Sequence, residues 1–579
     1  MDKKNYLIAN IIPLIPLPPN SPDYFTYFTE IYLDKGSLVE IDFRKKKILG
    51  IIYEVKNVQQ ARKDLLEILP KIKKITKIVK EKTIINEDEF TFAKFLSSYF
   101  GFSFSSIFKF FFFPSKRFLD LNLKKEEKKN KRFFKINYFE KLNLKILRKK
   151  RSLIIIPEKS FAQEVEEILK EGKFSYRIFI PPWNKRKIEE ISQELNKNEK
   201  IALIISKNLI FLPWKNIDQI VVYREGSFFY YDSFKKINFD YREIIKKLAE
   251  IKKLELTYID SFPSLEKIKK LKIKPTLNLN IHILNSLEEA LESLKNFSKI
   301  IIFFPQKVSA GVRCLNCFNL LQCPQCQSYL FFDKEKFFCF QCLKEIKIEK
   351  NECPFCFKPL EVSLKKIGVK TLYSYLKKNY AEVYFVEKKE KKFFKNMEKR
   401  EKFIFLGSLS LISGYLKHAE ASYFFNFENF YLSSDPFLRE KYLRILNFLK
   451  EKTKTIFLIS SIRNPEWEKS FLKGDYPERL LKERELLRLN PFYQVIKLIK
   501  GSSDFYFLQN YMIKISKELK EKLKNQEIEV LGPIFSKPHK IKKRFFLEII
   551  LRSQKEDIKI REIVKEYGFE KIKINPLEI

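Results

Sequence analysis

Short apolar runs separated by charged segments dominate the first hundred residues. Three of these runs, Ile8–Leu17, Leu38–Phe43 and Ile48–Val55, have the length and the content of β-branched and aromatic residues that are typical of strands. The stretch Phe90–Phe100 repeats its apolar residues at helical spacing. The pattern therefore predicts a small, β-rich N-terminal domain that includes one helix.

From residue 153 onward the pattern changes to alternating strands and helices. A wholly apolar run, Leu153–Ile156, precedes the helical segment Phe161–Leu169, and strands are predicted again at Ile201–Ile205 and Ile217–Tyr223. Such alternation is typical of an α/β layer with parallel strands. A second α/β stretch begins at Ile300–Phe304 and resumes, after an interruption, at residues 368–379, 382–386 and 402–407.

A last basic region contains further strands at residues 495–499, 527–532 and 544–551. Together these patterns predict a multidomain α/β protein. Its segments are an N-terminal domain (1–113), a basic connector (114–151), a first α/β lobe (152–295), a second α/β lobe (296–477) with a cysteine-rich module (311–360), and an α+β C-terminal domain (478–579).

The chain of 579 residues is strongly basic, with 113 Lys and Arg against 72 Asp and Glu, a formal net charge of +41. A chain this basic usually binds a polyanion. The 58 Phe and 13 Gly indicate a compositional bias that weakens the charge argument on its own. No apolar run is long enough to span a membrane, and the N-terminus has no signal-peptide cleavage pattern. We therefore expect a cytoplasmic, nucleoid-associated protein without membrane contacts.

All eight cysteines lie between residues 314 and 356, as four Cys-x-x-Cys pairs. This spacing lets one knuckle present two sulfurs to one ion, and Zn²⁺ takes four such ligands in a tetrahedron. Four knuckles predict two closed, structural zinc sites and hence two Zn²⁺ per chain. A disulfide cluster is the alternative, which an intracellular chain disfavours.

The pairing of the knuckles follows from the segment between the second and the third. Apolar residues flank the polar residues 333–336, which predicts a hairpin that brings those two knuckles together. The first and fourth knuckles then pair outside it. The predicted ligands are Cys314, Cys317, Cys353 and Cys356 for the outer zinc, and Cys323, Cys326, Cys339 and Cys342 for the inner zinc.

Several stretches, in order along the chain, resemble primosomal protein N′ (PriA), the family of bacterial replication restart helicases. Besides the four knuckles, they are Leu153–Glu158, Phe211–Val222, Pro263–Glu266, Asn490–Tyr493, Val530–Pro533 and Lys573–Leu577. The resemblance implies two RecA-like helicase lobes with a double zinc-ribbon insertion. It also implies an N-terminal domain that binds a DNA 3′ end, and a C-terminal domain that binds DNA or partner proteins.

The helicase motifs of that family are degenerate here. The stretch that corresponds to the glycine-rich phosphate loop, near Lys131–Phe139, has no glycine. The acidic motif falls on Tyr223-Arg224-Glu225-Gly226, where Tyr and Arg cannot hold Mg²⁺. The arginine motif falls near Phe448–Lys454, which contains no arginine. We therefore expect no ATP cofactor, no catalytic residue and no helicase activity.

The function that this resemblance favours is replication restart without ATP hydrolysis: binding of forked, branched and single-stranded DNA, and help in reloading the replicative helicase within the primosome. Implied partners are single-strand DNA-binding protein, the replicative helicase and its loader. Two alternatives stay open: an active ATP-dependent 3′–5′ DNA helicase with diverged motifs, and a zinc-ribbon protein that binds RNA or assists transcription.

The resemblance also assigns roles to a few residues outside the knuckles. Lys73 falls on a basic position of the 3′-end pocket, and Arg44 replaces a family glycine there. The 3′-end motif matches either Pro22-Asp23-Tyr24 or Phe25-Thr26-Tyr27. Phe95, Tyr99 and Arg544 fall on positions that dock the tail of single-strand binding protein, and Glu548 replaces a family glutamine, so we expect it to repel an acidic tail.

Overall fold

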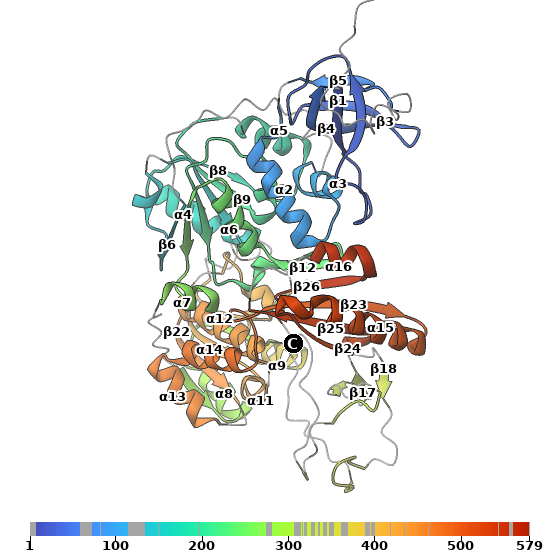
Figure 1. Cartoon of the computed structure of the whole chain (residues 1–579). Helices are drawn as coiled ribbons and strands as arrows, with labels where there is room; N and C mark the ends of the chain where they lie inside the picture. The colour runs from blue at the N-terminus through green and yellow to red at the C-terminus, as the bar shows by residue number, and fades with distance from the viewer. Residues whose placement is uncertain are drawn as a thin grey trace, which may run out of the picture. The chain divides into compact units, whose positions relative to one another are not determined.

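The computed structural model describes residues 7–57, 72–113, 134–273, 281–305, 369–387, 394 and 400–577, apart from residues 82, 149, 196, 417, 434, 461–462, 542 and 555–559. Between residues 306 and 368 it describes residues 314, 316–317, 321–325, 330–333, 336–339, 344–346 and 352–359. The chain divides into two compact units (Figure 1). The first contains Met1–Glu225, Asp240–Asp260 and Asp557–Phe569, and the second contains Gly226–Phe239, Ser261–Glu556 and Glu570–Ile579.

The first unit begins with a five-stranded antiparallel sheet in the order β2-β1-β4-β3-β5. Its core contains Ile11, Val39, Ile41 and Ile52. In β3, Val39 and Ile41 alternate with the more exposed Glu40 and Asp42, as expected for a strand. The structure confirms the three predicted strands and adds β2 and β5. The bounds are β1 Leu7–Pro13, β2 Phe25–Thr29, β3 Leu38–Phe43, β4 Lys46–Asn57 and β5 Lys77–Lys80.

Helix α2 (Glu87–Phe100) confirms the predicted helix and connects this sheet to the rest of the unit. Its start is fixed by a capping box between Asn86 and Glu89, and it ends at Gly101 with a φ of 70°. Glu89 is fully buried, and its carboxylate lies 2.6 Å from Lys252 Nζ and 3.6 Å from Lys215 Nζ, both outside the N-terminal sheet. Helices α3 (Phe104–Ile107) and α16 (Ile560–Tyr567) also contact α2.

The second part of this unit is a six-stranded parallel sheet in the order β6-β13-β10-β7-β9-β8. Every residue of β7 and β10 is buried, as expected for strands that are covered on both faces. The strands are β6 Lys135–Phe139, β7 Ser152–Ile156, β8 Tyr176–Phe179, β9 Ala202–Ser206, β10 Gln219–Tyr223 and β13 Glu255–Ile259, and the helices are α4 Ala162–Glu171, α5 Lys185–Glu194 and α6 Tyr241–Ile251.

The second unit contains another six-stranded parallel sheet, in the order β14-β22-β21-β15-β20-β19. The cysteine-rich segment leaves after β15 and the chain returns at α9, so the interruption falls inside this lobe as predicted. The strands are β14 Ile281–Leu284, β15 Lys299–Phe303, β19 Val383–Val386, β20 Phe403–Gly407, β21 Ala419–Phe424 and β22 Thr453–Ile459. The helices are α7 Leu265–Leu271, α8 Leu287–Leu294, α9 Val369–Asn379, α11 Glu428–Leu432, α12 Pro436–Lys452, α13 Pro465–Lys473 and α14 Tyr476–Leu486.

A further six-stranded sheet, in the order β11-β12-β26-β23-β25-β24, belongs to this unit, and helix α15 (Phe505–Leu523) packs along β23, β25 and β24 (Figure 1). Its first two strands come from the middle of the chain, which the sequence did not predict, because pairing between distant segments leaves no local signal. The strands are β11 Tyr231–Phe234, β12 Ile237–Asp240, β23 Gln494–Ser502, β24 Glu529–Ile541, β25 Arg544–Ser553 and β26 Lys571–Ile574. Among the residues that the structure describes, no helix is both long and apolar enough to cross a membrane.

Candidate functional site

The first candidate site is a group of four cysteines. The Sγ atoms of Cys314, Cys317, Cys353 and Cys356 all lie within 4.8 Å of one another. Two of the Sγ–Sγ distances, Cys314 to Cys356 and Cys317 to Cys353, are 3.7 Å. A tetrahedron with Zn–S bonds of ~2.3 Å has edges of about 3.8 Å, so the group fits one zinc ion. Cys314 and Cys353 are buried, which suits a closed site.

These four residues are the ones that the sequence groups as the outer site. The hairpin that motivated the grouping is also present: β16 (Phe331–Asp333) pairs antiparallel with β17 (Lys336–Cys339), which pairs with β18 (Lys344–Ile346). Of the inner group, Cys323 is buried and Cys339 is described only as part of β17. Cys326 and Cys342 lie outside the described residues, so the inner zinc site stays a prediction.

The second candidate site is the carboxyl edge of the parallel sheet in the first unit, where α/β folds usually bind ligands. The strands β6, β13 and β10 lie side by side, and their last residues, Phe139, Ile259 and Tyr223, are in register. A phosphate loop follows a strand and opens a helix. The sequence placed the equivalent loop near Lys131–Phe139. The structure corrects this, because residues 135–139 form β6 and the chain leaves that strand at Glu140.

The segment after β6 does not have the form of a phosphate loop. It runs from Glu140 into a single 3₁₀ turn, η5 (Leu144–Leu147), with side chains at every position. Nearby, the Tyr138 hydroxyl donates to the backbone carbonyl of Asp260. Burial, together with Asp260, raises the pKa of Tyr138 well above its usual range, so this phenol stays neutral. Bulky side chains lie where a phosphate loop needs bare backbone N–H groups.

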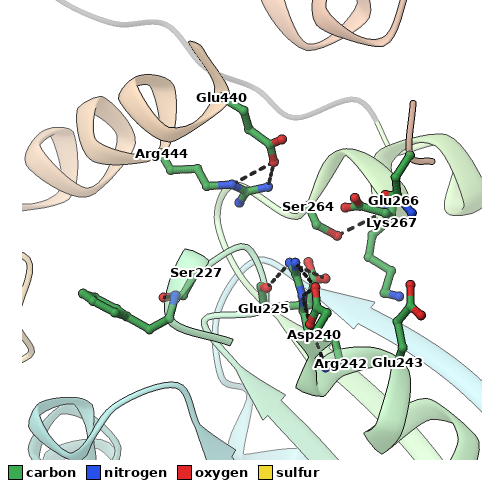
Figure 2. Close-up of polar contacts among 12 residues, drawn as sticks. Glu225, Ser227, Asp240, Arg242, Glu243, Ser264, Glu266, Lys267, Glu440 and Arg444 are labelled. Atoms are coloured by element: carbon green, nitrogen blue, oxygen red, sulfur yellow. Dashed lines mark hydrogen bonds and ion pairs between the residues drawn. The ribbon is translucent and has the colours of Figure 1, made fainter. Parts of the chain in front are cut away.

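The acidic-motif positions at the end of β10 are engaged in ion pairs within the protein. Arg224 has a φ of 56°, and its Nη2 lies 3.0 Å from the Glu164 carboxylate. Glu225 is fully buried, and Arg242 Nη1 donates to its carbonyl oxygen at 2.9 Å and lies 3.5 Å from its Oε1. Arg242 Nε also lies 2.9 Å from each carboxylate oxygen of Asp240 (Figure 2).

One guanidinium therefore neutralises the carboxylates of both Glu225 and Asp240. Sequence analysis identified Glu225 as the remaining acidic position but missed Asp240 and Arg242. The sequence offered one local signal for Asp240: it precedes an amphipathic stretch, as a helix N-cap does, and it caps α6 in the structure. Neither the degenerate motif nor its spacing indicates that Arg242 turns back onto both carboxylates.

The arginine-motif region lies in the second unit. Residues 448–454 form the end of α12 and the start of β22, and Phe448 and Leu449 are buried. The nearest preceding arginine on α12 is Arg444, whose Nε lies 2.9 Å from Glu440 Oε1 (Figure 2). Arg439, earlier on the same helix, lies 2.8 Å from both carboxylate oxygens of Glu483. Both arginines of this helix thus form ion pairs within the lobe.

Arg44 lies in the turn between β3 and β4, whereas Lys73 lies in the segment before β5, where its carbonyl oxygen accepts from the Phe28 N–H at 3.0 Å. Lys73 Nζ lies 3.2 Å from the carboxylate of Asp42, and Arg44 lies 5.5 Å from the Phe43 ring centroid. Arg44 and Lys45 have φ values of 49° and 61°, a left-handed turn that favours glycine. Glycine adopts this conformation without strain, whereas Arg44 adopts it at some energetic cost.

The two tyrosines of the candidate 3′-end motifs differ in exposure. Tyr24 is 41% exposed, and its ring stacks on Tyr53 with centroids 5.4 Å apart. Tyr27 is buried in the sheet core, its hydroxyl donates to the carbonyl of Asp42 at 3.1 Å, and burial raises its pKa to about 12. Tyr24 alone of the two presents its ring to solvent.

The three predicted partner-binding residues fall in different units. Phe95 and Tyr99 lie on α2 with ring centroids 5.4 Å apart, and the Tyr99 hydroxyl lies 3.2 Å from a carboxylate oxygen of Glu243 on α6. Arg544 begins β25 and lies 2.6 Å from Glu570. The expectation that Glu548 repels an acidic tail is wrong, because Glu548 is buried and its carboxylate lies 3.0 Å from Lys497 Nζ.

Comparison with known proteins bears directly on these sites. A family model described as the 3′ DNA-binding domain (3′BD) of PriA matches residues 14–112. Two curated proteins named replication restart protein PriA also match. The one from Helicobacter pylori (strain ATCC 700392 / 26695) is 24% identical over 393 residues, which cover 59% of this chain and 60% of that protein. The one from Rickettsia conorii (strain ATCC VR-613 / Malish 7) is 22% identical over 416 residues, which cover 59% of this chain and 61% of that protein.

The chain is similar to PriA proteins over more than half of its length. It spans about 60% of the length of the curated PriA relatives that it matches. Among solved structures, one of RecG bound to a three-way DNA junction matches with a TM-score of 0.35 and 10% identity, covering 61% of this chain and 44% of that chain. The match to the 3′ DNA-binding domain covers β2 to β5 and α2, and so includes Arg44, Lys73, Phe95 and Tyr99.

Proposed function

We propose that this chain is a replication restart protein that binds forked DNA and helps to reload the replicative helicase without hydrolysing ATP. The match of residues 14–112 to the PriA 3′ DNA-binding domain supports the DNA-binding part. The basic net charge of +41 supports a polyanionic partner. The Arg242 ion pairs with Glu225 and Asp240 support the absence of ATP chemistry.

In this proposal, the N-terminal sheet holds the 3′ end of a leading strand. Of the two candidate motifs, Pro22-Asp23-Tyr24 has the exposed ring, so Tyr24 is the aromatic contact we favour. Lys73 and Arg44 supply positive charge near the phosphates. Arg44 sits where the family has a glycine, so we expect the pocket to admit the strand end from a different angle.

The parallel sheets serve in this proposal as a scaffold. Phosphoryl transfer depends on positioning and on charge stabilisation by a phosphate cradle, a metal ion and an arginine. In this chain Arg242 neutralises the acidic positions, and the arginines of α12 pair with Glu440 and Glu483. Residues that are committed to internal ion pairs are not available to MgATP.

The two zinc ions of this proposal, held by the outer and inner cysteine groups, would fold the cysteine-rich module. Zn²⁺ in a closed Cys₄ site supplies folding free energy and no reaction. We further propose that single-strand binding protein contacts Phe95 and Tyr99 in the first unit and, separately, Arg544 in the second unit. The helicase and its loader would bind the protein at the fork. These roles place the protein in the cytoplasm, on the nucleoid.

The test measures fork binding and ATP turnover on one sample. We expect binding to a fork with a leading-strand 3′ end to exceed binding to plain duplex of the same length, and to weaken when that end carries a 3′-phosphate. ATP turnover should stay at background with and without the fork. DNA-stimulated turnover on the order of 1 s⁻¹, within the usual enzyme range, would restore the helicase alternative. Equal affinity for fork and duplex would remove the restart function.

A further inference from the structure

Tyr53 of β4 is the extra residue of a β-bulge in the N-terminal sheet. Asn10 of β1 pairs with Glu54 of β4. The next residue of β1, Ile11, pairs with Ile52, so Tyr53 lies opposite no residue of β1. A bulge re-aims the side chain of its extra residue, and bulges are over-represented next to active sites. The backbone of the sheet therefore sets the direction of the Tyr53 ring.

The backbone beside the bulge is fixed by the loop that precedes β3. The Gly36 N–H donates to the Ile52 carbonyl oxygen at 2.7 Å, and the Ile52 N–H donates to the Ser37 carbonyl oxygen at 2.9 Å. Gly36 has a φ of 89°, and a Cβ at this position would lie 2.1 Å from the Ile85 carbonyl oxygen, so the loop needs glycine here. Both peptide groups of the residue before the bulge are therefore held in place.

The Tyr53 ring contacts one exposed ring and two buried ones. It stacks on Tyr24 with centroids 5.4 Å apart and an interplanar angle of 13°. It meets Phe90 of α2 edge-on at 5.7 Å and Phe104 of α3 edge-on at 6.1 Å. Phe90 and Phe104 are buried, whereas Tyr24 is 41% exposed. Tyr53 therefore connects the exposed Tyr24 ring to the buried rings of α2 and α3.

A cation also lies over the Tyr53 ring. Lys35 Nζ lies 5.0 Å from the Tyr53 centroid and 4.8 Å from the Phe90 centroid, within the range of a cation–π contact. The same ammonium pairs with Glu87 at 2.7 Å, which limits its movement. Tyr53 is thus held by a bulge, two buried rings and a cation. A ring that is already fixed needs little ordering when a partner stacks on it.

We propose that Tyr53 is a positioning residue for the 3′ end of the strand, because it holds the Tyr24 ring in the plane on which the terminal base stacks. Base stacking gains affinity when the aromatic ring needs no ordering on binding. This inference rests on the proposed function and deepens it. It assigns a role to a residue that lies outside both candidate 3′-end motifs.

The test uses the full chain and two forks that differ only at the leading-strand 3′ end, which carries a hydroxyl in one fork and a phosphate in the other. Tyr24→Leu should weaken binding of the hydroxyl fork by roughly five- to 150-fold, the contribution of one base stack. Tyr53→Leu should weaken it by about two- to tenfold, the contribution of one aromatic pair. Tyr53→Phe keeps the ring and should restore binding. Affinity for the phosphate fork should stay the same in all three variants.

A double variant separates positioning from direct contact with DNA. If Tyr53 acts only through Tyr24, Tyr53→Leu should have no further effect in the Tyr24→Leu background. Phe108→Leu is the packing control, because Phe108 contacts Phe90 at 5.5 Å and Phe104 at 5.2 Å in the same buried cluster. This control should lower thermal stability and leave the affinity for the hydroxyl fork unchanged.

Fluorescence of 2-aminopurine as the 3′-terminal base reports the stacking itself. Binding to the unchanged protein should quench it. The quenching should be lost in Tyr53→Leu and should return in Tyr53→Phe.

The outcomes distinguish this inference from the function on which it rests. Undiminished binding of the hydroxyl fork by Tyr53→Leu, or an equal further loss in the Tyr24→Leu background, would overturn the positioning role. A preference of the unchanged protein for forks over duplex would then leave the restart function standing. Equal affinity of the unchanged protein for fork and duplex would overturn both. Equal losses in Phe108→Leu and Tyr53→Leu, without rescue by Tyr53→Phe, would show that Tyr53 acts through packing and would also overturn the positioning role.

Discussion

The cysteine cluster has the side chains and the geometry of a ligand site, whereas the carboxyl edge of the first parallel sheet has only the backbone framework of one. In the cluster, four side chains from two distant knuckles meet with the spacing of a zinc tetrahedron. At the sheet edge, the strands remain in register, but Tyr138, Arg224 and Arg242 occupy the positions that a nucleotide site needs. In the function that we propose, the backbone framework of the lobe is kept without nucleotide chemistry, whereas the cysteine side chains are kept in the geometry of a zinc site.

The largest expected effect is at the cysteines. Cys353→Ser should lower the zinc content from two ions per chain to one, because structural zinc sites contribute roughly 10–16 kcal/mol of apparent binding free energy and need all four thiolates. Native mass spectrometry and elemental analysis measure the stoichiometry. Phe357→Ser, in the same knuckle and 76% exposed, is the control and should keep both ions. Equal zinc content in the Cys353 variant and the unchanged protein would contradict the four-cysteine assignment.

The second prediction concerns the sheet edge. Arg242→Met should destabilise the first unit by about 3–5 kcal/mol, because it removes the guanidinium that pairs with the buried carboxylate of Glu225 and with that of Asp240. Hydrogen exchange of β10 and α6 amides measures this loss in the unit concerned. Arg186→Met is the control, since Arg186 is 88% exposed and its pair with Glu190 contributes at most ~1 kcal/mol.

A second substitution tests whether the buried charge of Glu225 causes this loss of stability. Adding Glu225→Gln to the Arg242 variant should recover part of the stability, because a buried neutral amide needs no counter-ion. We expect neither variant to gain ATP turnover, since the described segment from β6 to η5 contains no glycine-rich loop. ATP turnover in the Arg242 variant would show that the ion pairs only mask a working site.

The sequence predicted the cysteine site in more detail than the sheet edge, and the reason is physical. Cys-x-x-Cys spacing fixes ligand geometry within four residues, and the polar turn at 333–336 indicated which knuckles pair. The sequence also shows that this region has no phosphate-loop glycines. It put the equivalent segment too early in the chain, because β6 is an edge strand of only five residues, none of them fully buried, and is hard to predict. Arg242 pairs with Glu225 across 17 residues, and β12 pairs with β26 across more than 300, so neither contact has a local signature.

The third prediction tests whether the first lobe supports the N-terminal region. Burial alone would raise the pKa of Glu89, but Lys252 and Lys215 outweigh it and hold this pKa below its usual range. The stabilisation that Glu89 provides is therefore present above the unfolded-state pKa of about 4.3 and is lost as the pH falls through the folded-state value.

Glu89→Gln should thus weaken hydrogen-exchange protection of α2 by about 2–3 kcal/mol at neutral pH, since it removes one member of a buried ion cluster. The difference from the unchanged protein should shrink on acidification below about pH 4. Glu87→Gln, on the same first turn with a 71% exposed side chain, is the control and should change little. A difference that persists unchanged in acid would show that Glu89 acts through shape and not through charge.

The smallest effect is expected at the DNA surface that the scaffold carries. Lys73→Ala and Arg44→Ala should each lower the slope of log K against log salt by roughly 0.7–0.9 for fork DNA, the contribution of one neutralised phosphate, and should weaken binding only several-fold at moderate salt. Lys73 pairs with Asp42, so its loss also exposes the DNA to a carboxylate that it now neutralises. Its effect should therefore exceed that of Arg44. Lys185→Ala, whose side chain is 75% exposed on α5, is the control for an exposed lysine that is not part of the N-terminal sheet. If all three variants had the same slope of log K against log salt, Lys73 and Arg44 would not contact phosphates. The N-terminal sheet would then hold the strand end by shape and by stacking on Tyr24.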